Sequence, residues 1–186
     1  MSINRKDFLK TACLSGVCLC GFSAIARSAN SIDPSVPSAS DDNQILIQDW
    51  VSMLISNLGV GLDQEAVRTV IRKSAIVHYN NLKMDDVLAG YIGNLDKFIG
   101  FLQEKWNWKI DYNKATKTLI ASENKNYCVC PIIKHKKEQD TSAICYCSEG
   151  FTEKMFSTVA GVATTATVVS SIRRGDAFCK YKIVFA

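Results

Sequence analysis

The chain has few of the residues and motifs that mark the common classes of enzymes and nucleic-acid-binding proteins. It has two histidines, His78 and His135, and no Ser-His-Asp order, phosphate-cradling glycine loop or paired-carboxylate motif. The haem attachment pattern Cys-x-x-Cys-His is also missing. The pair Gly59-x-Gly61 is typical of a helix end rather than a nucleotide loop. The cysteines are therefore the residues that carry most of the chemical information.

The N-terminal segment has no apolar run of membrane-spanning length. The uncharged stretch Thr11–Ala26 has 16 residues, whereas a spanning helix needs about 20. A short basic region precedes it, and Ala24-Ile25-Ala26 is a small-x-small cleavage pattern. This order predicts a cleavable export signal over residues 1–29, with membrane contact only during export. An uncleaved anchor helix is the alternative.

The segment Asn4–Lys10 resembles a twin-arginine export signal, with Lys6 in place of the second arginine. The resemblance implies that the protein crosses the membrane already folded, and clients of this route often carry a metal or cofactor. The expected location is then the bacterial periplasm. The general export route is the alternative.

Little net charge remains once the signal is removed. Residues 1–29 contain four of the 22 basic residues and one of the 18 acidic residues, so the remainder has a net charge of about +1. Nucleic-acid binding needs a clustered excess of Lys and Arg, so no nucleic-acid partner is expected. The densest basic run, Lys134–Lys137, contains His135 and is predicted to be a solvated loop.

Residues 30–42 are rich in Ser, Pro and Asp and predict a flexible linker, which leaves residues 43–186 as a single domain. A helix is predicted at the start of this domain. Its apolar residues recur at helical spacing and are expected to face the core: Leu46, Trp50, Met53, Leu54 and Leu58. Polar residues line the opposite side: Gln48, Ser52 and Ser56.

Two further helices are predicted before the pattern changes. Asp63 is expected to cap one of them, whose apolar side includes Val67, Ile71 and His78. The most regular helical stripe runs over residues 88–102, with glycines that can interrupt it.

After Trp106 the period changes from about 3.6 to 2, which indicates strands. The expected elements are a hairpin over 108–122, an extended segment Tyr127–Ile133, a short helix over 151–159, a strand over 163–172 and a last strand over 178–185. This order predicts an α+β domain, in which N-terminal helices pack on a mostly antiparallel sheet and one short helix precedes the last hairpin.

Five of the eight cysteines lie beyond the signal. They form two Cys-x-Cys pairs and a late single residue: Cys128, Cys130, Cys145, Cys147 and Cys179. Residues two apart in an extended segment point to the same face, so Cys128 and Cys130 are expected to present both sulfurs together, and Cys145 and Cys147 likewise if their stretch is extended. Cys179 shares its face with the apolar side of the last strand. The three groups are therefore predicted to converge.

Three chemical interpretations of this cluster stay open, and inert buried thiols are the remaining alternative. An oxidising compartment favours disulfides, although five is an odd number. Four thiolates suit zinc or an iron–sulfur cluster, held by Cys128, Cys130, Cys145 and Cys147.

The third interpretation is a catalytic thiol. Cys147 precedes a predicted helix start, where the helix dipole lowers a thiol pKa, and Cys145 and Cys179 are the next candidates. His78 could act as its base, although a core or pocket-edge histidine is the simpler interpretation.

The second half, roughly residues 106–186, resembles the L-2-amino-thiazoline-4-carboxylic acid hydrolase family. The residues that carry the resemblance are Cys130-Pro131, the run Cys145–Phe151 and the close Ser171–Tyr181. The ending Gly-Asp-x-x-Cys-x-Tyr also looks like a 4-vinyl reductase type of small-molecule-binding domain. Matching positions are Cys130, Pro131, Gly150, Gly175, Asp176 and Cys179. Cys128 and Cys147 are additions to the family pattern.

The resemblance implies helices packed on an antiparallel sheet around a ligand pocket. The expectation is an exported small-molecule-binding protein, hydrolytic if Cys147 acts as nucleophile. The alternatives are a non-enzymatic binding module with a structural metal and a disulfide-stapled structural domain.

Overall fold

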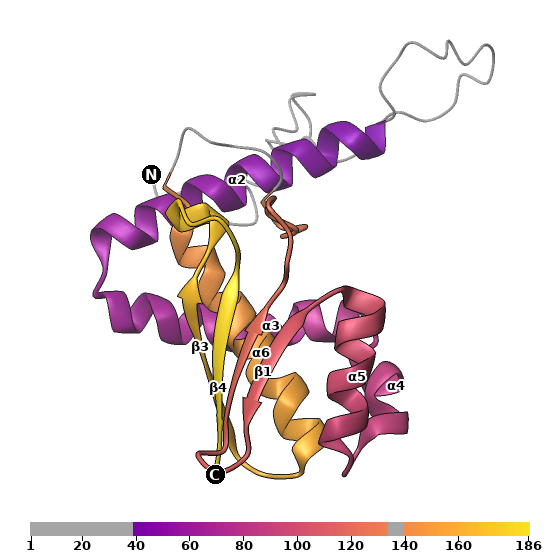
Figure 1. The fold of residues 1–186 in the computed structure, drawn as a ribbon. Coiled ribbons are helices and arrows are strands. Elements are labelled where there is room, and N and C mark those ends of the chain that lie inside the picture. The colour runs from indigo at the N-terminus through magenta and orange to yellow at the C-terminus, as the bar shows by residue number, and fades with distance from the viewer. Residues whose placement is uncertain (1–38, 134–139) are drawn as a thin grey trace, which may run out of the picture. The chain divides into compact units, whose positions relative to one another are not determined.

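Helices fill the first part of the described chain and strands the later part (Figure 1). The computed structural model describes residues 39–133 and 140–186, with side chains from residue 43 onward. The predicted export signal, most of the predicted linker and His135 lie outside these ranges. Helix α2 already begins at Ala39, within the last residues of the predicted linker.

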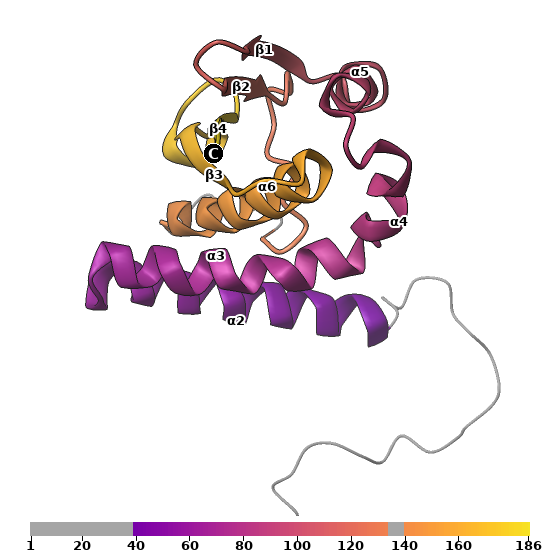
Figure 2. The same cartoon turned by 90° about the horizontal axis from the view of Figure 1, so that it is seen from below.

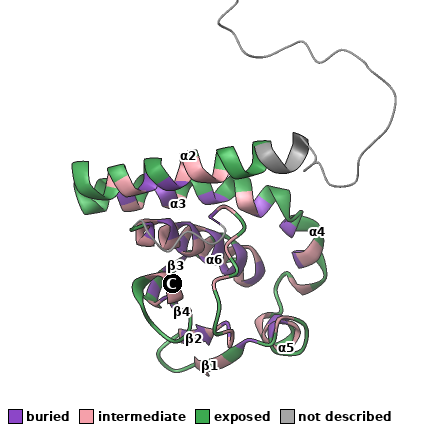
Figure 3. Cartoon of the chain, turned by 90° about the horizontal axis from the view of Figure 1, so that it is seen from above, coloured by how far each residue is buried: buried purple, intermediate pink, exposed green. Residues whose placement is uncertain are grey.

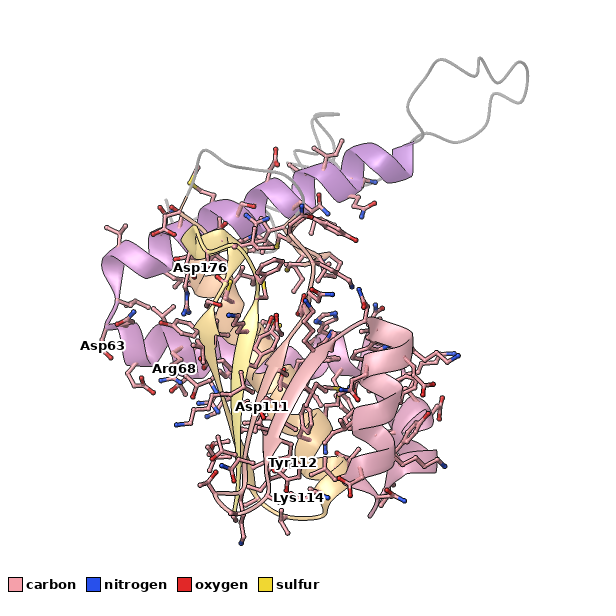
Figure 4. The ribbon with its side chains drawn as sticks, in the orientation of Figure 1. Asp63, Arg68, Asp111, Tyr112, Lys114 and Asp176 are labelled. Carbon is pink, nitrogen blue, oxygen red and sulfur yellow. The ribbon has the colours of Figure 1, made fainter. Side chains whose placement is uncertain are left out.

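The helices are α2 (Ala39–Gly61), α3 (Gln64–Asn81), α4 (Met84–Leu88), α5 (Leu95–Trp106) and α6 (Cys145–Ala160). Short 3₁₀ turns cover Ala89–Tyr91, Ser142–Ile144 and Ile172–Arg174. Asp63 caps α3, because its carboxylate accepts hydrogen bonds from the backbone N–H groups of Glu65 and Ala66 at 3.1 and 3.0 Å. Figure 4 labels Asp63 at this helix start.

The strands are β1 (Lys109–Asn113), β2 (Thr118–Ser122), β3 (Thr164–Ser170) and β4 (Lys180–Phe185). They form one sheet in the order β1-β2-β4-β3, and every neighbouring pair is antiparallel. The predicted hairpin over residues 108–122 is β1 and β2. The predicted α+β class is confirmed, with α6 placed before the final pair of strands.

The elements are stacked in layers. Helix α6 lies on the sheet, α3 packs along α6, and α2 lies beyond α3 (Figure 2). Helix α3 buries Val67, Ile71, Ala75 and Tyr79 against the core, and α6 buries Phe151, Met155, Phe156 and Val159. The inward residues of β4, Tyr181, Ile183 and Phe185, complete the core from the sheet side.

Gly150 allows α3 and α6 to pack very closely. A Cβ atom at this position would lie 2.2 Å from the backbone oxygen of Arg72 and 2.9 Å from Cβ of Ala75. Real Cβ atoms do not approach a backbone oxygen so closely, and backbone cannot move aside as a long side chain can. The glycine is therefore required by the helix crossing itself.

Two carboxylates of α6 tie this crossing to the edge strand. Glu149 is 1% exposed, and it accepts hydrogen bonds from Arg68 Nε at 2.8 Å and from the Val168 backbone N–H at 2.9 Å. One helical turn later, Glu153 pairs with Arg72 and accepts the Ala166 backbone N–H at 3.2 Å. Figure 4 shows Arg68 on α3. The buried charge of Glu149 is thus paired and hydrogen-bonded, as its burial requires.

Replacing Glu149 with glutamine is expected to lower the free energy of unfolding by about 2 kcal/mol, because hydrogen bonds to a buried charge weaken. Urea denaturation followed by circular dichroism measures the change. The matched control is Glu65→Gln, which removes an exposed partner 3.6 Å from Arg68 and should cost under about 0.5 kcal/mol. Equal effects of the two substitutions would contradict the structural role of Glu149.

The structure corrects two details of the predicted elements. The segment Tyr127–Ile133, predicted to be extended, is irregular and pairs with no strand of the sheet. The predicted inward face of the first helix is also wrong. Leu46, Trp50 and Met53 are exposed, whereas Ser52 is buried on the inner side.

The polar side of α2 has partners that explain this orientation. Gln48 donates a hydrogen bond to the Pro131 carbonyl at 3.1 Å, and the Ser52 hydroxyl donates to the Gln48 carbonyl at 2.7 Å. Ile55 is buried on the same side. None of the helices in the described part of the chain combines the length and apolarity needed to cross a membrane.

Candidate functional site

A cavity of about 550 Å³ lies at the end of the sheet where β2 and β3 finish and β1 and β4 begin. Its wall comes from four parts of the later chain, residues within 105–108, 123–131, 144–152 and 168–181, and from the end of α3. Figure 4 shows Asp176 at this end of β4 and Lys114 at the opposite end of the sheet. The cavity is therefore assembled from segments that are far apart in the sequence.

All five cysteines of the described chain line this cavity. They are Cys128, Cys130, Cys145, Cys147 and Cys179. The first two belong to the irregular segment after β2, the next two to the first turn of α6, and the last directly precedes β4. The predicted convergence of the three cysteine groups is present in the structure. All five are free thiols, so the arrangement does not favour the disulfide interpretation.

Burial disfavours the thiolate form of four of these thiols, those of Cys130, Cys145, Cys147 and Cys179. Burial raises the pKa of Cys147 to about 11, and the nearby Cys130 and Cys145 add to the effect. Burial also raises the pKa of Cys179 to about 11, against a hydrogen bond from the Ile172 backbone. The pKa values of Cys130 and Cys145 are raised by burial as well.

These shifts oppose the effect expected at a helix start. Helix α6 begins at Cys145, so Cys147 is inside the first turn rather than before the helix, and it is buried. Burial in an apolar wall disfavours the thiolate more than the helix dipole favours it. The thiol of Cys145 instead donates a hydrogen bond to Ser171 Oγ at 3.3 Å. The arrangement does not favour an activated nucleophile.

Metal coordination is not favoured either. Within residues 39–133 and 140–186, no three side chains of His, Cys, Asp or Glu are grouped so that they could hold a metal ion. The second Cys-x-Cys pair is helical, and residues two apart on a helix point in different directions. The expected sharing of one face by Cys145 and Cys147 is therefore wrong, and the predicted zinc or iron–sulfur ligands do not form a tetrahedral set.

A carboxyl–phenol pair supplies two buried polar groups of the cavity wall. The Tyr181 hydroxyl donates to Glu123 Oε1 at 2.5 Å, and both residues are buried. Burial raises the pKa of Glu123, although the hydrogen bond from Tyr181 and the charge of Lys125 oppose this. Burial raises the pKa of Tyr181 well above its usual value. Burial therefore disfavours the charged forms of both residues.

Glu123 was not a candidate from the sequence, because a lone glutamate after a strand looks like a solvated turn residue. Only the pairing of the strands reveals it. Ser122 at the end of β2 pairs with Lys180 at the start of β4, which brings Glu123 close to Tyr181.

Aromatic rings form much of the apolar wall. Trp106 and Trp108 line the cavity with their ring centroids 5.7 Å apart, and Trp108 stacks on Tyr181 at 5.8 Å. His78 also lines the cavity, 4.9 Å from the Phe151 ring, and burial lowers its pKa. His78 is therefore a pocket-edge histidine whose charged form is disfavoured by burial.

The irregular segment that carries Cys128 and Cys130 is held by Arg173. The Arg173 guanidinium donates to the Ile133 carbonyl and to Thr141 Oγ1, the latter at 3.0 Å. Asp176 accepts the Ser171 backbone N–H at 2.8 Å, and Gly175 has a φ of 91°. The Gly175-Asp176 pair thus shapes the turn before β4, and neither residue lines the cavity.

Residues 35–186 match the family described as "Family of unknown function (DUF6144)", and the chain therefore belongs to that family. No curated protein matches the chain. Among solved structures, it is similar to trafficking protein particle complex subunit 3 from Naegleria fowleri covalently bound to palmitic acid. The identity is 11%, the TM-score is 0.49, and the match covers 79% of this chain and 96% of that one. A likeness at this level carries no information about function.

Proposed function

We propose that this member of the DUF6144 family binds a small, mainly apolar molecule in the cysteine-lined cavity. The observation that carries the proposal is the cavity of about 550 Å³ with a buried, hydrogen-bonded Glu123–Tyr181 pair in its wall. Ligand sites in proteins usually enclose about 300–1,000 Å³ and combine an apolar lining with a few convergent polar groups. The size and composition of this cavity fit that description.

The lining indicates the chemistry of the ligand. Trp106, Trp108 and the protonated thiol of Cys147 offer a polarizable, uncharged part of the wall, beside the charged side chains of Lys105, Lys125 and Arg173. The Glu123 carboxyl, with its raised pKa, offers a hydrogen bond to one polar group of the ligand. An uncharged molecule with an aromatic or aliphatic body and a single carbonyl, hydroxyl or amine group suits these features.

Binding is favoured over hydrolysis by the state of the thiols. A cysteine nucleophile acts as thiolate, and a pKa of about 11 leaves Cys147 protonated at neutral pH. The hydrolase-like resemblance then concerns the pocket rather than the reaction. Export, proposed from the N-terminal signal, would place this binding activity outside the cytoplasm.

The uncharged fluorophore N-phenyl-1-naphthylamine tests the proposal. Titrated into the purified full chain, it should gain fluorescence with a saturable curve, because it leaves water for an apolar cavity. The variant Val129→Trp adds a large side chain to the cavity wall and should weaken probe binding about tenfold or more.

The matched control is Val169→Trp, which adds the same side chain to an exposed position of β3 outside the cavity. It should bind the probe as the unchanged protein does. A saturable curve that Val129→Trp leaves unaltered would show that the probe binds elsewhere, and no saturable curve would remove the proposed function.

A further inference from the structure

The sheet has one face that no helix of the described chain covers (Figure 3). Exposed and buried residues alternate along β4, and the same alternation runs along β3. Successive side chains of a strand point to opposite faces of a sheet. The buried residues face the helices, so the exposed residues form the open face of the sheet.

Two lysines flank a serine hydroxyl on this open face. Lys109 of β1 pairs with Ser122 of β2, and Ser122 pairs in turn with Lys180 of β4. The Cβ atoms of directly opposite residues are about 4.5–5.5 Å apart, so the two lysines stand on the order of 10 Å apart across the serine. A hollow of about 390 Å³ lies here, and all three residues line it. We name these three residues the Lys-Ser-Lys row.

The two lysines of the row have charges that are not used within the fold. Neither Lys109 nor Lys180 has an ion-pair or hydrogen-bond partner for its side chain among residues 39–133 and 140–186. Lys114 differs, because its ammonium group pairs with Asp96 at 2.7 Å. The row therefore presents two free positive charges to whatever enters the hollow.

One acidic side chain lies in the wall of the hollow. It is Asp111 of β1, which Figure 4 labels. Asp111 pairs with Ile120, and Ile120 pairs with Lys182, so a third lysine stands in the same cross-strand row as the acid. Lys182 offsets the charge of Asp111, and the positive charge of the Lys-Ser-Lys row remains.

We propose that the Lys-Ser-Lys row binds the phosphate group of a small phosphate monoester. A phosphate monoester carries about −1.5 to −2 charge at pH 7 and three acceptor oxygens. Two ammonium groups and one hydroxyl match that charge and that number of oxygens, whereas a carboxylate has one charge and two oxygens.

The wall of the hollow also offers a surface for the organic part of the ester. Phe178 lines the hollow and is 37% exposed. Its carbonyl accepts a hydrogen bond from the Ser170 hydroxyl at 2.8 Å, which holds this segment beside the start of β4. An aromatic or aliphatic body of the ester can pack on the Phe178 ring.

The hollow is separate from the cysteine-lined cavity. Each residue of the Lys-Ser-Lys row is adjacent in sequence to one residue of the cavity wall, and those neighbours are Trp108, Glu123 and Tyr181. Adjacent residues of a strand point to opposite faces, so the two sites lie back to back at one end of the sheet. The inference therefore does not depend on the proposed cavity ligand.

The test is a titration of the purified, nitrogen-15-labelled full chain with phenyl phosphate, followed by two-dimensional NMR. The backbone amide signals of Ser122 and Lys180 should shift along a saturable curve, with a dissociation constant of about 1 mM or below. Benzoate should bind about tenfold more weakly, because it has one charge and two oxygens. Phenol, which has no charge at neutral pH, should leave these signals in place.

Lys109→Gln and Lys180→Gln should each weaken phenyl phosphate binding about tenfold, the effect of losing one charged hydrogen bond. The matched control is Lys73→Gln, which removes the same charge from an exposed position of α3 and should bind as the unchanged protein does. Val129→Trp should also bind phenyl phosphate normally, because it alters only the cavity.

Four results would overturn the proposal. The first is the absence of a saturable shift, including the case in which the protein binds only phosphatidylglycerol vesicles. The second is benzoate binding as tight as that of phenyl phosphate. The third is an equal loss of binding in Lys73→Gln and Lys180→Gln, which would mean unspecific attraction. The fourth is a loss of binding in Val129→Trp alone, which would place the probe in the cavity.

Discussion

Replacing Gly150 with alanine is expected to lower the free energy of unfolding by about 3 kcal/mol or more, enough to unfold a marginal domain. The added Cβ would lie 2.2 Å from the Arg72 backbone oxygen, and relief requires α3 and α6 to move apart. That movement would also lengthen the hydrogen bond from Arg68 to Glu149. Urea and thermal denaturation followed by circular dichroism measure the loss.

The control for this substitution is Gly100→Ala in α5. Gly100 is also helical, but a Cβ there meets no atom within 4 Å. Alanine favours a helix over glycine by up to about 1 kcal/mol, so this variant should be as stable as the parent or slightly more stable. If both alanine variants were equally stable, the close helix crossing would not exist in solution.

The second large effect concerns the chemistry of the thiols. Iodoacetamide should alkylate Cys147 about 100-fold more slowly at pH 8 than an unperturbed thiol, because a pKa of about 11 instead of 9 lowers the thiolate fraction by that factor. Peptide mass spectrometry after timed quenching gives the rate at this residue. The rate should rise about tenfold for each pH unit up to about pH 11.

The same protein in concentrated urea serves as the reference, since unfolding removes the burial that raises the pKa. Cys147 should then react at the ordinary rate. Fast alkylation of the folded protein at pH 7 would contradict the buried, protonated thiol. It would restore Cys147 as a candidate nucleophile.

The helix and strand types were predictable, because they depend on local periodicity. The hairpin of β1 and β2, the cap at Asp63 and the end of α6 at Gly161 all follow from spacing and turn residues. Which side of α2 faces the interior was not predictable in the same way. Periodicity shows which residues share a side of a helix, but the choice of inner side depends on neighbours such as Pro131.

The candidate site was predictable only in part. The cysteines could be expected to converge, because chemistry-bearing residue types stand out in a sequence. The carboxyl–phenol pair could not, since Glu123 and Tyr181 are 58 residues apart and meet through sheet register. The raised thiol pKa values could not be predicted either. They are caused by burial, and burial depends on how whole helices and strands pack together.

The contacts of Glu149 and Glu153 have a consequence for the behaviour of the protein at high concentration. Strand β3 is an edge of the sheet, and an edge with unpaired N–H groups can recruit a strand from another molecule. The two carboxylates occupy the N–H groups of Val168 and Ala166. Helix α6 therefore leaves these two N–H groups unable to pair with a strand of another molecule, which disfavours aggregation through the β3 edge.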